Sequence, residues 1–412
     1  MMVKKSCFLI VAAWMVSGCA VNEVITADIN HLDVAEVAPP EEMLLDIGVV
    51  EFDDGVPEDN DPVKTGIYQE VRSAEVRYLP YHLKTTLQGT GHWGAVRVIP
   101  SRSAFTDVII SGVIEKSNGE YVELRLKVED AMGHEWFEKV YETQTGISSY
   151  SEYRDRANDP YQNVFNDFSN DLREYMAALP AKQVQQIRQV SELQFFGDMA
   201  PLSFGDHLTN NKDGTISIVR LPAENDPTAA RLRQIRERDR LVVDTLNEHY
   251  ANFYYGIAIP YEGWRKISRE EQVNYRQVRR SAAMRTLLGV VVLAGSVAMD
   301  TDNSSHSSTR RMKRGIQTVG ITKGFEAIMS GLTRRSEAKI HLESIKELSE
   351  SFGSEAAPMV ITVQGETRRL TGTATAQYES WRRLLKQIYQ AETGFSGPLE
   401  VGVPTRGEQP SG

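Results

Sequence analysis

The alternation of hydrophobic and polar residues in the first half of the chain predicts a small sheet. Residues 122–128 alternate strictly between apolar and charged side chains, which predicts a strand with one buried face. Asn118-Gly119 just before it predicts a hairpin turn, because both residues tolerate positive φ. Further strands are expected in a run that begins at Leu45 and in the stretches AVRVIP, DVIISGVI and EWFEKVY.

Helical periodicity accompanies these strands. A helical stretch is expected from about Ile67 to Leu87, with its first glycine, Gly89, as C-cap. Asp159-Pro160 has the residue types of an N-cap and a first helical position, and apolar residues at helical spacing follow it.

The second half of the chain is mainly helical in its pattern. Asp226-Pro227 begins one predicted helix, and Ser268 with Glu271 has the spacing of a capping box that begins a second. Another helical stretch is expected at about 310–352. The sequence MVITVQGETRRLTG predicts a hairpin, and a terminal helix follows from the periodic positions Trp381, Leu384, Leu385, Ile388 and Tyr389.

These elements predict an α+β fold, in which a mixed α/β sandwich module precedes a mainly helical region. That region should hold a Gly/Ala-rich helical hairpin and a small C-terminal β-hairpin plus helix. The expected order is a signal peptide at 1–18, a lipidated tether at 19–42, the α/β module at 43–180, a helical linker region at 181–265, the helical hairpin with the C-terminal β-hairpin and helix at 266–395, and a disordered tail at 396–412.

Residues 286–299 form the most apolar run after the N-terminus. As a helix these fourteen residues span about 21 Å, whereas a bilayer core is about 30 Å thick. Arg285 and Asp300 bracket the run, so we expect it not to cross a membrane. Small residues here and on the returning stretch instead predict close helix packing, within the chain, with a second copy or on a membrane surface. The alternative is an ordinary core hairpin with solvated flanking arginines. The residues of this helix-packing seam are Gly289, Ala294, Gly295, Ala298, Gly320 and Gly324.

The N-terminus has the pattern of an export signal. Lys4 and Lys5 precede a short apolar stretch, and Val16-Ser17-Gly18-Cys19 follows. This ending resembles the lipobox of bacterial lipoproteins, which implies cleavage before Cys19 and lipidation of its sulfur and new amino group. Ala20 follows the cysteine, which by the sorting rule of that family implies the outer membrane, with the protein facing the periplasm.

The stretch SGVIEKSNGEYVELRLKVEDAMGHEWFEKVYE carries a second resemblance. Its hairpin pattern resembles periplasmic lipoproteins with an anticodon-binding-like α/β module, a group that includes the penicillin-binding-protein activator lipoprotein, the curli secretion lipoprotein and the TolB amino-terminal domain. The resemblance covers about residues 44–145 and implies a non-enzymatic module that binds other envelope proteins.

Composition narrows the function classes. The chain has two cysteines, Cys7 and Cys19; the first is removed with the signal and the second is acylated, so no disulfide is expected. A formal net charge of −10 argues against nucleic-acid binding.

Motifs for catalysis, metals or cofactors are weak. Gly89, Gly91 and Gly94 spell G-x-G-x-x-G, but a helix precedes and a strand follows, the reverse of a dinucleotide site. The histidines show no local metal-binding spacing. The acidic loop from Asp53 to Asp61 is read as solvated, and the aromatic stretch from Tyr250 to Trp264 as core between two helices. We therefore expect no cofactor, metal or catalytic residue.

The sequence favours an outer-membrane-anchored periplasmic lipoprotein that binds or scaffolds envelope proteins in secretion, envelope assembly or cell-wall synthesis. The lipid would insert in the inner leaflet of the outer membrane. Two alternatives stay open: an envelope hydrolase whose site is not visible as a motif, and a structural subunit that forms a homo-oligomer through the helical hairpin.

Overall fold

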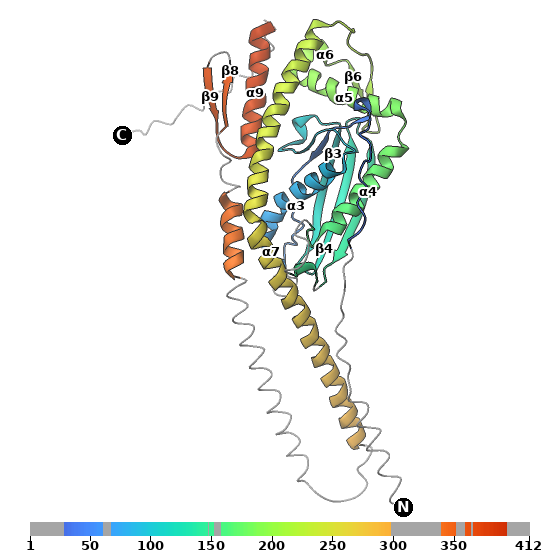
Figure 1. Ribbon diagram of the computed structural model, residues 1–412, viewed down its shortest axis with the longest axis vertical. Coiled ribbons are helices and arrows are strands. Elements are labelled where there is room, and N and C mark those ends of the chain that lie inside the picture. The colour runs from blue at the N-terminus through green and yellow to red at the C-terminus, as the bar shows by residue number, and fades with distance from the viewer. Residues whose placement is uncertain are drawn as a thin grey trace, which may run out of the picture.

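The computed structural model describes residues 29–60, 67–146, 148–151, 158–297, 339–351, 359–363 and 366–393, and of residues 275–297 only the backbone. Figure 1 shows a sheet with helices packed on it and one long helix that passes the whole body and continues beyond its lower end. The mixture of helices with a sheet that is partly parallel and partly antiparallel confirms the predicted α+β class.

A five-stranded sheet forms the centre of the fold, in the order β2-β1-β3-β4-β5. β1 is parallel to both β2 and β3, and β3, β4 and β5 form an antiparallel meander. Gly119 adopts φ +79° in the turn between β3 and β4, as the Asn118-Gly119 signal predicted. The strands are β1 (Ile47–Val49), β2 (Val96–Val98), β3 (Val108–Ser117), β4 (Tyr121–Asp130) and β5 (Glu135–Gln144).

The first helix of the module, α3 (Gln69–Thr90), contains Pro80 and still runs without interruption. Proline has no N–H, so the carbonyl of Val76, four residues earlier, loses its helical donor. The N–H of Phe52 donates to that carbonyl at 3.0 Å, which satisfies it from outside the helix. The expectation that Gly89 ends this helix is wrong: Gly91, at φ +71°, is the left-handed C-cap, because the helical turns continue through Thr90.

The helix α4 (Gln162–Ala178) packs on β5 and β4, on the same side of the sheet as α3. Its N-cap residue is Tyr161, so the expected capping role of Asp159-Pro160 is wrong. Asp159 does accept a hydrogen bond from the N–H of Tyr161, but its carboxylate binds the guanidinium of Arg265 on another helix. Asp159, which has the local pattern of a capping residue, therefore makes a long-range contact instead.

The longest element, α7 (Pro227–Val297), has 71 residues and crosses the outside of α3. Asp226 caps it as expected, through its side chain and the N–H of Thr228. The expectation of a new helix at Ser268 is wrong, since the Ser268 hydroxyl donates to the carbonyl of Asn118 in the β3–β4 turn instead of capping. α7 also runs unbroken across the expected boundary at residue 265.

α7 closes the outer edge of the sheet at β2. The side-chain amide of Asn247 accepts from the N–H of Val98 at 2.8 Å and donates to its carbonyl at 3.0 Å. Arg97 of the same strand pairs with Asp244 at 2.6 Å. A helix side chain therefore takes the hydrogen bonds that a sixth strand would make.

The C-terminal part folds back on the upper half of α7, where the predicted hairpin and terminal helix are present. Asp239, buried on α7, accepts from the hydroxyl of Tyr378 at 3.1 Å and from the indole N–H of Trp381 at 3.0 Å. The remaining elements are α5 (Ala181–Met199), α6 (Pro201–Phe204), β6 (Leu208–Asn210), β7 (Ile216–Ile218), β8 (Met359–Val363), β9 (Glu366–Leu370) and α9 (Ala374–Thr393).

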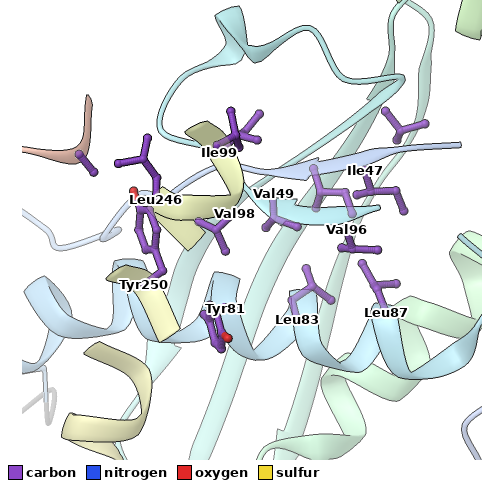
Figure 2. Close-up of a cluster of buried hydrophobic side chains, with 14 of the residues drawn as sticks. Ile47, Val49, Tyr81, Leu83, Leu87, Val96, Val98, Ile99, Leu246 and Tyr250 are labelled. Atoms are coloured by element: carbon purple, nitrogen blue, oxygen red, sulfur yellow. The ribbon is translucent and has the colours of Figure 1, made fainter. Parts of the chain in front are cut away.

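One connected hydrophobic core joins the sheet, α3, α4, α5, α7 and α9. Figure 2 shows the part where Ile47, Val49, Val96 and Val98 of the sheet meet Leu83 and neighbouring side chains of α3 and α7. Leu124 is fully buried, which confirms the predicted core face of the alternating strand. The domain ranges expected from the sequence stay a prediction, but the core does not divide at residue 180.

Candidate functional site: the α7 crossing and the docked tether

The crossing of α7 over α3 is lined with tyrosines. The rings of Tyr78 and Tyr254 stack with centroids 4.5 Å apart, and Tyr261 meets Tyr78 edge-on at 4.7 Å. This agrees with the interpretation of the aromatic stretch as core, since Tyr250 and Trp264 are also buried. Tyr255 is the exception, with 67% of its surface exposed.

A buried ion pair fixes α7 to the start of α4. The guanidinium of Arg265 donates to both carboxylate oxygens of Asp159, each at 2.8 Å, and the Arg265 side chain is only 2% exposed. The same guanidinium lies between two rings, 4.3 Å from the centroid of Tyr261 and 4.8 Å from that of Tyr161. Burial alone would raise the pKa of Asp159, but the charge and hydrogen bonds of Arg265 hold it well below its usual range.

A second buried acid lies beside this pair. Glu75 of α3 accepts from the hydroxyls of Ser117 at 2.5 Å and Tyr261 at 2.6 Å. Burial raises the pKa of Glu75, and the nearby guanidinium of Arg72, 3.6 Å away, opposes this shift. Because its partners come from α3, β3 and α7, this carboxyl group ties three elements together.

A series of hydrogen bonds connects Tyr254 at the crossing to Asn30 near the start of the described chain. The Tyr254 hydroxyl lies 2.7 Å from Nδ1 of His82, and Nε2 of His82 lies 2.9 Å from Oε1 of Gln162. Burial lowers the pKa of His82, which favours the neutral ring. Because Oε1 of Gln162 can only accept, Nε2 of His82 donates to it, and Nδ1 of the neutral ring accepts from the Tyr254 hydroxyl. Gln162 in turn donates to Oδ1 of Asn166, and Asn166 donates to the carbonyl of Asn30 at 2.7 Å. Asn166 therefore binds the tether through its NH₂ group, while its Oδ1 faces Gln162.

The tether, defined here as residues 29–36, lies along α4 and is held mainly through its main chain. Asn163 accepts from the N–H of Asn30 at 2.9 Å. Asn170 donates to the carbonyl of His31 at 2.7 Å and accepts from the N–H of Asp33 at 2.9 Å. Asn163, Asn166 and Asn170 follow each other at helical spacing and form one row, which we call the asparagine row.

Side chains add three contacts to the docked tether. Asp167 accepts from the side-chain amide of Asn30, at 2.8 and 2.9 Å, and Asp33 pairs with Arg173 at 2.5 Å. Nε2 of His92 also lies 3.9 Å from Oδ1 of Asp33. Farther along, the N–H of Ala35 donates to the carbonyl of Thr90 at the end of α3. The segment expected to be a tether is therefore docked from Asn30 to Ala35.

The outward face of α7 carries exposed apolar side chains. Leu241, Tyr255 and Ile259 are 66%, 67% and 82% exposed. Five helical turns separate Leu241 from Ile259, so the two lie on one line roughly 27 Å long, opposite the face that packs on α3. The polar residues Thr245, Glu248 and Asn252 lie between the apolar ones on this line. We call this line the outer stripe of α7.

A polar cleft of about 480 Å³ lies beside the N-terminal ends of β1, β2 and β3, and residues of α5 and α7 also line it. Arg188, Arg233, Arg236 and Arg240 line it, together with Asp46, Asp107 and three glutamates. Each arginine already donates to the protein; Arg240, for example, donates to Asp46 at 2.8 Å, and Arg236 to the carbonyl of Phe105 at 3.1 Å. A ligand here would have to displace these contacts.

The predicted site residues fall mostly in parts that the structure does not describe. Cys19, Ala298, Gly320 and Gly324 lie outside the described residues, and Gly289, Ala294 and Gly295 lie on the last turns of α7, where only the backbone is described. The seam and the lipidation site stay predictions. Across the described ranges, no group of histidine, cysteine and acidic side chains could hold a metal ion, and no helix is long and apolar enough to cross a membrane.

Comparison of the chain with protein-family models, with characterised proteins and with solved structures finds no match. The residues of the crossing and the asparagine row were not singled out from the sequence. The spacing of the three asparagines was visible there, whereas nothing local indicates that Asp159 meets a residue 106 positions away.

Proposed function

We propose that this chain is a non-enzymatic, lipid-anchored protein of the outer membrane that faces the periplasm and holds other envelope proteins along α7. The observation that carries the proposal is the outer stripe of α7. Large apolar side chains on one exposed line of a helix are typical of a surface that a partner covers. The buried contacts at the crossing and with α9 support it, because they hold this helix in a fixed position.

The anchor is the part of the proposal that comes from the sequence. Cys19 ends a lipobox-like motif, and ten residues separate it from Asn30, where docking on α4 begins. Extended, that length reaches at most about 40 Å. A lipid on Cys19 would hold the body close to the membrane surface.

Two variants test the two halves of the proposal separately. Cys19→Ala should abolish labelling by palmitate and move the protein from the membrane to the soluble fraction. Ile259→Glu should leave the protein membrane-bound and folded but reduce partner capture after crosslinking in intact envelopes. A matched control is Leu202→Glu, which changes a similarly exposed leucine, 77% exposed, on α6.

The outcomes discriminate between functions. Capture that is lost in Ile259→Glu and retained in Leu202→Glu supports binding along α7. Equal capture by both variants excludes the outer stripe as the binding surface, and continued palmitate labelling of Cys19→Ala excludes the anchor.

A further inference from the structure

The asparagine row on α4 has the features of a binding site for extended main chain. Four of its hydrogen bonds, between 2.7 and 2.9 Å long, go to backbone N–H and C=O groups of residues 30–33. Such contacts depend on the extended path of the bound segment and little on its side chains. Asn170 binds a carbonyl and an N–H two residues apart, which only an extended segment can present together.

Residues of the body orient the asparagine row. The Oδ1 of Asn166 accepts from the side-chain amide of Gln162 on the same helix. Gln162 is oriented in turn by His82, which contacts Tyr254 of α7. The donor group of Asn166 is therefore directed outward whether or not a peptide lies in front of it.

The tether itself is held at the surface. Residues 29–31 are exposed, and Leu32 and Ala35 are only partly buried, so little apolar area supports the docking. Hydrogen bonds and ion pairs at exposed positions contribute little individually, because water competes for the same groups. A segment held in this way belongs to the part of a structure that opens most easily.

We propose that the asparagine row is a peptide-binding site that the chain's own tether occupies, and that an extended peptide of another envelope protein can take its place. The preferred peptide has an asparagine followed three residues later by an aspartate, because Asp167 binds the side chain of Asn30 and Arg173 binds Asp33. Between these two positions the asparagine row binds main-chain groups of the peptide, so the side chains there are free to vary.

Displacement would change the reach of the anchor, a consequence that rests on the proposed lipid at Cys19. With the tether docked, ten residues lie between Cys19 and Asn30, and this connection extends to about 40 Å. With residues 29–36 released, the chain next contacts the body at Glu41, whose carbonyl accepts from Arg188 at 2.8 Å, so the connection from Cys19 extends to about 75 Å. Peptide binding would thus let the body move away from the membrane.

The test uses the full chain and a labelled peptide with the sequence of residues 29–36, INHLDVAE. The chain's own tether competes at a high effective concentration, so the wild-type chain should bind the peptide weakly. In Asn30→Ala/Asp33→Ala the tether loses its side-chain contacts with Asp167, Arg173 and His92. The peptide should then bind about tenfold more tightly, as measured by fluorescence anisotropy.

Variants of the chain and modified peptides serve as controls. Adding Asn166→Ala to the loosened chain should abolish the gain, whereas adding Glu174→Ala, an exposed change on the same helix, should preserve it. A peptide that carries alanine at the positions of His31 and Leu32 should still bind, and one N-methylated at the Asp33 amide should not. Thermal melts check that each variant is folded, and Asn170→Ala replaces Asn166→Ala if the latter unfolds.

Equal peptide binding by the wild-type and loosened chains would overturn the proposal, as would binding that survives both the asparagine substitutions and the N-methylation. The peptide experiment does not involve Cys19 or the outer stripe of α7. Its failure would therefore leave the proposed anchor and the α7 surface to be judged by their own variants.

Discussion

Two segments from outside the sheet attach to the same helical layer, and they attach in different ways. α7 is held on α3 and α4 by buried rings, by a fully buried carboxyl group and by an ion pair whose arginine is 2% exposed. The tether is held on α4 by a similar variety of polar contacts, but at exposed positions and with little apolar area. Because removing one partner of a buried pair costs far more than removing one at the surface, we expect the α7 attachment to be much stronger than that of the tether.

The largest effect is expected from breaking the buried pair. Asp159→Asn leaves the guanidinium of Arg265 buried without a counter-charge, which should lower the free energy of unfolding by about 3–5 kcal/mol. Urea denaturation at neutral pH measures the loss. Asp206→Asn, which removes the exposed partner of Arg220, is the matched control and should cost under about 1 kcal/mol. Similar losses in both variants would show that burial does not set the strength of the α7 attachment.

The same pair should also make stability depend on pH. The folded pKa of Asp159 lies below its unfolded value, so its contribution is present above the unfolded pKa, near 3.9, and is lost as the pH falls through the folded value. The difference in unfolding free energy between the wild type and Asp159→Asn should therefore shrink by about 2–3 kcal/mol between neutral pH and about pH 2. An equal difference in unfolding free energy between the wild type and Asp159→Asn at both pH values would contradict the assignment of a depressed pKa to Asp159.

A smaller effect is expected where the β3–β4 turn meets α7. A Cβ on Gly119 would lie 2.1 Å from the carbonyl oxygen of Arg265, so Gly119→Ala should push the turn and the helix apart. Gly214→Ala is a close control, because that glycine also has a positive φ, +87°, but has no atom within 4 Å of an added Cβ. The difference in unfolding free energy between the two variants should be about 1–3 kcal/mol. No difference would mean that α7 is not packed tightly there.

The smallest global effect is expected at the tether. Asn170→Ala removes the acceptor of the Asp33 N–H and should change the unfolding free energy by less than about 1 kcal/mol. Hydrogen exchange of the Asp33 amide should nevertheless accelerate about tenfold, because the local opening becomes easier. If Asn170→Ala lowered the unfolding free energy as much as Asp159→Asn, the two attachments would not differ in their contribution to global stability.

The sequence was informative where structure depends on neighbours in the chain. Alternation placed Leu124 in the core, Asn118-Gly119 marked the turn, and the terminal helix followed from the spacing around Trp381. The lipobox-like motif and the small-residue seam are also local patterns, but the structure does not describe the residues that would test them.

The sequence was less informative where a residue with a local capping pattern binds a distant partner instead. Ser268 has the spacing of a capping residue, yet its hydroxyl donates to the β3–β4 turn and the helix continues. Asp159 looks like an N-cap, yet its carboxylate serves Arg265. Docking of the tether was not predicted either, because hydrogen bonds to main chain leave little trace in the side chains of the bound segment.

The contact between Asn247 and β2 bears on how this protein stays separate from its copies. An open sheet edge is a template on which another chain can add a strand, and such growth leads to aggregation. Asn247 blocks that template at β2 by occupying both hydrogen-bonding groups of Val98. At the opposite edge, β5 exposes the charged side chains Glu135, Glu138, Lys139 and Glu142, and charged residues on an edge strand disfavour the addition of another strand. These two features would keep the edges of the sheet from pairing with those of a second copy.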